Sequence, residues 1–153
     1  MLCDLRQSNL SLRKSELTIK AVTNTAELLE FAGVIKPYDP HAFLFYEKVC
    51  HLDLGADEHL HFFVGYLDNK PICTGSLFFK YELAGIYDII TNENYQGRGF
   101  GTAMMEFLMN YVKQKGFDYV CLTASSDSGF RIYDRLGFKS LGTFECFEWP
   151  GDK

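Results

Sequence analysis

The chain has 153 residues, of which 47% are hydrophobic and 23% charged. This length suits one domain and this apolar fraction can fill a core, so intrinsic disorder is excluded. The formal net charge of −5 argues against sequence-independent binding of nucleic acid, which needs a basic face. No apolar run approaches the ~20 residues of a membrane span, and the N-terminus lacks the pattern of a signal peptide. We therefore expect a cytoplasmic protein without a membrane or nucleic-acid partner.

The cysteines and histidines do not indicate a metal centre. Five cysteines are an odd number, are widely spaced and form no C-x-x-C pair. This pattern favours reduced thiols over a disulfide framework or a zinc site. His59 and His61 could lie on one face of a strand, but no cysteine or carboxylate follows at a convincing ligand spacing. We expect no metal.

The N-terminal part of the chain predicts a weakly anchored segment followed by a strand. Residues 1–14 offer few apolar anchors, so we predict that this segment is loosely ordered. We expect residues 15–153 to form a single domain. Residues 16–22 alternate apolar and polar side chains with period two, which predicts the first strand.

Two helices are expected next, each with an N-terminal signal. Asn24 and Glu27 have the spacing of a capping box, and a leucine-containing apolar stripe follows them. Asp39 and Pro40 supply an N-cap and a first-turn proline for a second helix over about 41–51.

Three strands are predicted in the middle of the chain. Residues 61–67 and 72–79 are strand-like and are joined by a polar turn. Residues 84–91 are apolar on both faces, which is typical of a central strand.

After a glycine-rich loop at 96–101, strands and helices alternate. An amphipathic helix runs from the loop to Gly116, followed by a buried strand over 119–124 and a helix over 126–136. Residues 139–148 are predicted to form the last strand. Phe144, Phe147 and Trp149 make this strand a candidate for pairing across a homodimer.

The expected order is therefore β-α-α-β-β-β-α-β-α-β. This order implies one parallel pairing beside an antiparallel meander. We predict a mixed α/β (α+β) fold: a single, mostly antiparallel central sheet flanked by four helices.

The loop Gln96-Gly97-Arg98-Gly99-Phe100-Gly101 lies between a buried strand and a helix. Alternating glycines let backbone N–H groups approach a ligand closely, and the helix dipole favours a phosphate or pyrophosphate there. A Walker A loop would need a lysine after Gly101. A dinucleotide fingerprint would need its third glycine at the position of Thr102. Both spacings fail.

Two motifs carry a resemblance to a known family. Gln96-x-x-Gly99-x-Gly101 resembles the acyl-CoA loop of the GNAT N-acetyltransferase superfamily. Tyr133-Asp134-Arg135-Leu136-Gly137-Phe138 resembles the Tyr-x-x-Leu-Gly-Phe signature of the same superfamily. The resemblance extends over about 84–138, and before that it is topological. Ala84-Gly85-Ile86-Tyr87 and Ala124-Ser125 are similar to a branch that acts on small molecules, sometimes as the second half of a longer chain.

The resemblance implies that acetyl-CoA is the cofactor and lies where the parallel strands 84–91 and 119–124 splay apart. A splayed strand edge leaves backbone groups that an amide-containing ligand can pair with. The residues implied to contact the cofactor are Ile89, Ile90, Thr91, Gln96, Gly97, Arg98, Gly99, Phe100, Gly101, Thr102, Ser126, Gly129 and Tyr133. The Arg98 side chain either adds local positive charge or is solvated. Ser126 and Gly129 depart from the Asn and Ala of many members.

The resemblance also implies the catalytic groups. Tyr133 matches the tyrosine that protonates the departing thiolate in many members. A phenol stays protonated at neutral pH and can donate. For the general base, Asp88 is the only carboxylate inside the strand before the loop, with Tyr87, Glu93 and an ordered water as alternatives. Strict alternation places Asp88 and Tyr87 on opposite faces, so only one of them can serve.

Residues on and before the second helix are expected over the acceptor end of the gap. Tyr38, His41 and Phe45, together with Tyr87, are the candidates for binding the acceptor, with a plain packing stripe as the alternative for the helix residues. The resemblance implies transfer of acetyl to a primary amine of a small molecule or protein by direct attack on the thioester. The alternatives are a CoA-binding regulatory or sensor domain and, against the loop spacing, a hydride-transfer enzyme.

Overall fold

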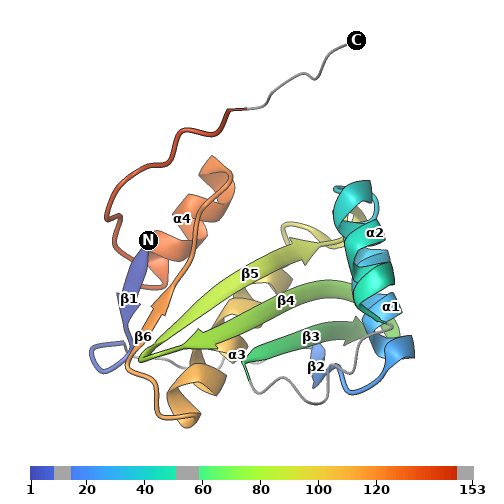
Figure 1. The fold of residues 1–153 in the computed structure, drawn as a ribbon, viewed down its shortest axis with the longest axis horizontal. Helices are drawn as coiled ribbons and strands as arrows, with labels where there is room; N and C mark the ends of the chain where they lie inside the picture. Colours follow the sequence, from blue (N-terminus) through green and yellow to red (C-terminus); the bar gives the residue numbers. More distant parts are fainter. Residues whose placement is uncertain (9–14, 51–58, 148–153) are drawn as a thin grey trace.

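The computed structural model describes residues 1–8, 15–50 and 59–147. These residues form one six-stranded sheet in the order β1-β6-β5-β4-β3-β2 (Figure 1). The strands are β1 (Leu2–Asp4), β2 (Thr18–Ala21), β3 (Leu60–Leu67), β4 (Lys70–Lys80), β5 (Leu83–Thr91) and β6 (Tyr119–Cys121). The α-helices are α1 (Thr25–Ile35), α2 (Pro40–Val49), α3 (Phe100–Gln114) and α4 (Asp127–Arg135), and Glu93–Tyr95 form a 3₁₀ turn. The predicted mixed fold, a mostly antiparallel sheet with four helices, is confirmed.

The sheet is antiparallel except at one pairing. Strand β5 runs parallel to β6, and only Leu83–Gly85 pair with Tyr119–Cys121. Beyond Gly85, β5 continues to Thr91 while β6 has ended. The two strands therefore diverge, as Figure 1 shows for β5 and for the chain that leads from β6 into α4. The predicted splay between the two parallel strands is present.

The two faces of the sheet carry separate cores. Met104, Leu108 and Val112 of α3 pack with the apolar side chains of one face. Phe31 of α1 and Tyr46 of α2 pack with those of the other face. Burial of these two apolar helix stripes holds the helices in place, because the hydrophobic effect scales with the apolar area removed from water.

The predicted helix starts are confirmed by their hydrogen bonds. The Asn24 side chain accepts a hydrogen bond from the Glu27 backbone N–H at 3.0 Å. Asp39 Oδ1 accepts from the N–H groups of His41 and Ala42, each at 2.9 Å. Such caps satisfy N–H groups that have no partner within the helix. Helix α2 ends at Val49, and His51, the last residue predicted for it, lies outside the described residues.

The prediction that residues 1–14 are loosely ordered is wrong for the first residues. Leu2–Asp4 form strand β1, which pairs antiparallel with β6. Cys3 and Leu5 are buried in the core beside α3. These two apolar side chains are enough to anchor the segment because the free edge of β6 supplies backbone partners as well. Residues 9–14 lie outside the described residues.

The predicted last strand over 139–148 is also wrong for its described part, up to residue 147. Lys139 and Leu2 exchange two backbone hydrogen bonds, and no strand is present in the residues that follow, up to 147. Strand β1 lies between β6 and Lys139, so the segment after residue 138 meets the outer edge of β1, a strand of only three residues, and pairs there at Leu2 alone. Phe144 and Phe147 are exposed, and Trp149 lies outside the described residues.

These two corrections lead to a paired prediction on stability. Leu5 is 0% exposed and Leu141 is 74% exposed. We expect Leu5→Ala to lower the free energy of unfolding by about 2–5 kcal/mol, because it leaves a cavity in the core. The matched change Leu141→Ala should alter it by less than about 0.5 kcal/mol. Urea unfolding of both variants checks this, and equal effects would contradict the observed positions of the two segments.

Candidate functional site

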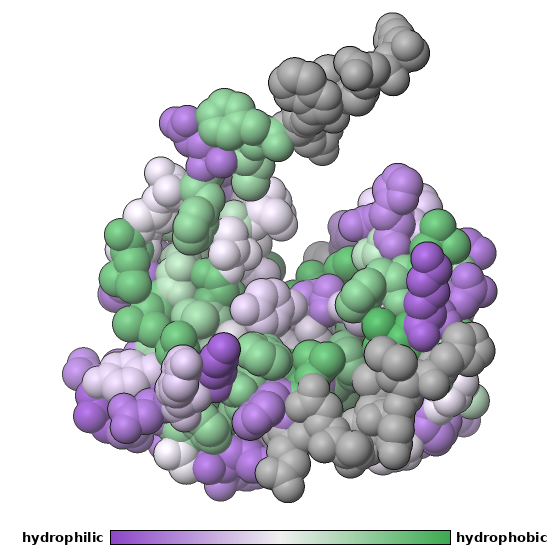
Figure 2. Space-filling model, in the orientation of Figure 1, coloured by the Kyte–Doolittle hydropathy of each residue, from purple (hydrophilic) through white to green (hydrophobic). Residues whose placement is uncertain are grey.

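A cleft of about 1130 Å³ opens where β5 and β6 diverge. Its walls are the end of β5, the glycine loop, the first turn of α3 and helix α4. In Figure 2 the molecular surface is hollowed between the part that carries α4 and the part that carries α2. The cleft therefore lies along the edge of β5 beyond Gly85, where β6 no longer pairs with it.

The glycine loop gives the cleft a wall made of backbone. Gly97 and Gly99 have φ values of 75° and 84°, a left-handed conformation that glycine adopts without steric cost. Gly99 is the N-cap of α3, and no side chain caps this helix. The first N–H groups of α3 have no partner within the helix, and the helix dipole makes this end positive. Since Phe100, Gly101 and Thr102 line the cleft, it presents donors suited to an anion.

One carbonyl joins the loop to the connection between α1 and α2. The carbonyl oxygen of Thr91, the last residue of β5, accepts hydrogen bonds from the Tyr38 hydroxyl at 3.1 Å and from Gln96 Nε2 at 3.0 Å. Tyr38, which was expected to contact the acceptor, thus lies in the cleft wall and contacts the loop.

Helix α4 supplies a tyrosine hydroxyl to the cleft. Tyr133 lines it, and its hydroxyl makes no hydrogen bond to the described residues. A Cβ on Gly129 would lie 3.3 Å from the Tyr133 ring, so the glycine leaves room for the phenol. Ser126 caps α4 by accepting a hydrogen bond from the Gly129 N–H at 3.1 Å. Burial raises the pKa of the Tyr133 phenol above its ordinary value, which keeps the proton on the oxygen.

Strict alternation fails at Asp88, where β5 contains a β-bulge. The register with β4 shifts between Thr74 and Ser76, and Asp88 has a left-handed φ of 56°. Ser76 is paired with Tyr87, and its hydroxyl also reaches the Asp88 carboxylate. The extra residue of a bulge re-aims the side chains that follow it. Tyr87 and Asp88 therefore share one face of the sheet, and the expectation of opposite faces is wrong.

The Asp88 carboxylate is held by two hydroxyls. Tyr46 of α2 donates to Asp88 Oδ2 at 2.7 Å, and Ser76 of β4 donates to the same oxygen at 2.5 Å. The Thr74 hydroxyl donates to the Asp88 carbonyl at 2.8 Å. Burial, together with the neighbouring carboxylate charge, raises the pKa of the Tyr46 phenol, so this group remains a donor. Asp88 thus links α2 to the bulge.

The structure brings together all but one of the residues expected at the cofactor. Arg98 is the exception: its guanidinium lies 3.6 Å from a Glu16 carboxylate oxygen and over the Phe100 ring, and the residue does not line the cleft. The expected residues that line the cleft are Ile89, Ile90, Thr91, Gln96, Gly97, Gly99, Phe100, Gly101, Thr102, Ser126, Gly129 and Tyr133.

Four more of the predicted site residues lie outside the cleft, and the sequence analysis did not predict several residues that line it. Asp88, Tyr87, His41 and Phe45 do not line this cleft. The missed lining residues come mostly from α4 and its start: Tyr95, Met105, Ser125, Ser128, Phe130, Arg131, Ile132, Asp134 and Arg135. Residues 128–135 all line the cleft, so helical periodicity would not have selected them; the signal was the position of α4 directly after the splayed strand β6. The hydrogen bond from Ser76 to Asp88 could not be predicted from the sequence, because it depends on the bulge in β5.

Two general features of the described residues concern metals and membranes. Among 1–8, 15–50 and 59–147, no three His, Cys, Asp or Glu side chains are grouped so that they could hold a metal ion. In the same ranges, no helix has the length and apolar character needed to cross a bilayer.

Comparisons with known proteins agree with this geometry. The family model described as "Acetyltransferase (GNAT) family" matches residues 23–138. An uncharacterized N-acetyltransferase of Methanocaldococcus jannaschii is 32% identical over 87 residues, which are 51% of this chain and 38% of that protein. An uncharacterized acetyltransferase of Streptococcus pyogenes serotype M1 is 30% identical over 86 residues, 56% of this chain and 59% of that protein. The chain thus matches less than two thirds of either relative.

A solved structure shares the fold. A predicted acetyltransferase from Clostridium acetobutylicum, whose structure was determined with acetyl-CoA, superposes with a TM-score of 0.65. The sequences are 17% identical, and the match covers 86% of this chain and 96% of the other. At this identity the likeness concerns the fold.

The burial of Tyr133 predicts its ionisation. Because its phenol pKa is raised, we expect the wild type to lose this proton only above the ordinary phenol value of about 10. The difference in phenolate absorbance between the wild type and Tyr133→Phe, recorded against pH on the folded proteins, isolates the group. A transition below about pH 10 would contradict the burial of this hydroxyl.

Proposed function

This chain belongs to the acetyltransferase (GNAT) family, and we propose that it transfers the acetyl group of acetyl-CoA to a primary amine of a small molecule or protein. The observation that carries the proposal is the cleft itself. It combines backbone N–H donors at the start of α3, a stretch of β5 that β6 does not pair with, and the Tyr133 hydroxyl, which bonds to no described residue. A thioester carried on a phosphorylated, amide-containing arm requires these three features. They are a site for the phosphates, backbone partners for the amides and a proton donor for the departing thiolate.

The chemistry of the cleft walls favours one orientation of acetyl-CoA. The pyrophosphate would lie against the N–H groups of 97–102, where the helix dipole is positive. The amides of the pantetheine arm would pair with the backbone of Ile89 and Thr91, which have no β6 partner. That orientation points the thioester along β5 toward the bulge. The solved acetyl-CoA complex with the same fold supports this cofactor.

The reaction would proceed by direct attack. The amine nitrogen bonds to the thioester carbon, and a backbone N–H on the edge of β5 stabilises the oxyanion that develops. The C–S bond then breaks and Tyr133 gives its proton to the departing thiolate. The pKa of Tyr133, raised by burial, keeps that proton available at neutral pH.

Asp88 is the proposed acceptor of the amine proton. Its carboxylate lies on the α2 face of β5, next to residues that line the cleft. The attacking amine would approach from this face while the cofactor occupies the splay, and the two would meet at the bulge. Proton transfer to a positioned carboxylate contributes a factor of roughly 10²–10⁴ in rate.

Binding of the cofactor is tested by two glycine variants. We expect Gly101→Glu to weaken acetyl-CoA binding at least about tenfold, because it places a carboxylate beside the pyrophosphate site. Gly33→Glu is the matched control, since Gly33 lies in α1, is exposed and has open space around its Cβ. Calorimetric titration with acetyl-CoA measures both. No binding by the folded wild type would overturn the proposed function.

Turnover is tested at Tyr133. With the best primary amine from an acceptor screen, Tyr133→Phe should lower kcat by about 10²–10⁴, because the thiolate then leaves without its acid. The acetyl-CoA dissociation constant should change less than about threefold, since the ring remains. Release of free CoA thiol is the assay. Tight CoA binding without turnover of any amine would instead indicate a CoA-binding regulatory domain.

A further inference from the structure

The bulge creates a second recognition surface on the α2 face of the sheet. Because Ser76 pairs with Tyr87 and bonds to Asp88, the phenol and the carboxylate both project from this face. The Tyr87 ring folds back over Gly85, where a Cβ would lie 2.7 Å from the ring. Without the extra residue, the carboxylate would point toward α3 and the pair would not exist.

The Asp88 carboxylate keeps one oxygen available. Both hydroxyl bonds, from Tyr46 and Ser76, end on Oδ2, and no described residue donates a hydrogen bond to Oδ1. Lys48, an exposed cation of α2, makes no ion pair with Asp88 in the described part of the chain. The group is half-buried, so its charge is only partly screened by water. A half-buried carboxylate whose Oδ1 has neither a donor nor a counterion among the described residues is suited to an ammonium ligand.

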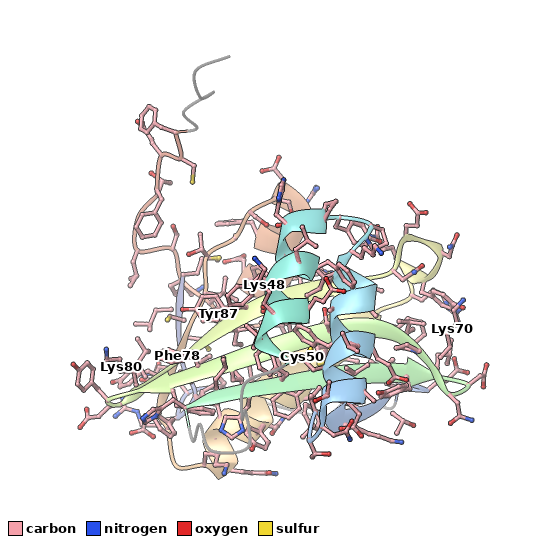
Figure 3. The ribbon with its side chains drawn as sticks, turned by 45° about the vertical axis from the view of Figure 1, so that its right-hand side comes forward. Lys48, Cys50, Lys70, Phe78, Lys80 and Tyr87 are labelled. Carbon is pink, nitrogen blue, oxygen red and sulfur yellow. The ribbon has the colours of Figure 1, made fainter. Side chains whose placement is uncertain are left out.

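Exposed aromatic side chains occupy the α2 side of the sheet, which is also the side of this carboxylate. Tyr87 is 53% exposed and Phe78, on the same face of β4, is 38% exposed. Figure 3 shows both on the part of the sheet beside α2. Phe45 of α2 is 59% exposed, and its ring lies 5.1 Å from that of Tyr46. Large exposed aromatic side chains on the side of the sheet that carries a charge are typical of a binding surface, and ring faces attract cations.

We propose that this surface is the acceptor subsite and that it takes a primary ammonium carried on an aromatic body. Asp88 Oδ1 holds the ammonium, and the rings of Tyr87, Phe45 and Phe78 pack against the apolar part. Tyr46 and Ser76 are positioning residues, because they fix the carboxylate through Oδ2. This inference rests on the proposed function and specifies its acceptor.

The two hydroxyls are necessary for this geometry. A carboxylate with no fixed partner rotates, and the entropy lost when a ligand orders it weakens the binding. Two donors from different elements, α2 and β4, remove that freedom. Tyr46→Phe keeps the ring that packs on Phe31 and Phe62 and removes only the hydroxyl.

Calorimetric titration of 2-phenylethylamine into the CoA-saturated protein tests the proposal without turnover. We expect the wild type to bind this amine, and to bind 2-phenylethanol, which lacks the charge, at least about tenfold more weakly. The double variant Tyr46→Phe, Ser76→Ala should bind the amine about tenfold more weakly, with the CoA dissociation constant unchanged.

Tyr66→Phe is the matched control. The Tyr66 hydroxyl donates to Glu30 Oε2 at 2.6 Å, an equivalent phenol–carboxylate contact between β3 and α1. We expect this variant to bind both ligands as the wild type does. Equal binding of the amine by the double variant and the wild type would overturn the positioning role. A protein that binds CoA and acetylates other amines but ignores 2-phenylethylamine would overturn the aromatic acceptor and leave the proposed function intact.

Discussion

The parallel ladder between β5 and β6 stops after Gly85 and Cys121, and the candidate site depends on that ending. Buried backbone groups of a sheet are normally paired, so a central strand that continues alone needs other partners. The Thr91 carbonyl finds them in Tyr38 and Gln96. The rest of the edge faces a cleft of about 1130 Å³, where a ligand with amides can complete the ladder.

The bulge at Asp88 connects this cleft to the opposite face of the sheet. Gly75 faces the bulge, and a Cβ there would lie 2.9 Å from Ile89 Cδ1, so the glycine admits the isoleucine on the α3 side. Asp88 then faces α2 and is held by Tyr46 and Ser76. One extra residue in β5 thus places Ile89, which lines the cleft, next to the Asp88 carboxylate, which contacts α2.

Local signals in the sequence predicted much of the fold, and the errors lie where a strand depends on a partner that is distant in the sequence. The caps at Asn24 and Asp39 and the loop glycines act within a few residues, so their patterns are readable. Strand β1 takes the edge of β6, and Lys139 pairs with Leu2 of β1, an arrangement that composition does not show. The bulge could not be predicted either, because its left-handed residue is Asp88 and not a glycine, the residue that usually indicates this conformation. Tyr133 was found through its motif, whereas the pairing of Tyr87 with Asp88 required the structure.

Backbone amide NMR during titration with CoA tests the central claim most directly, which is that the splayed edge of β5 and the start of α3 form the cofactor site. The account predicts that the largest shift changes fall on the amides of 89–91 and 97–102. Changes confined to other surfaces, such as the 360 Å³ hollow beside Tyr81 and Tyr119, would contradict it.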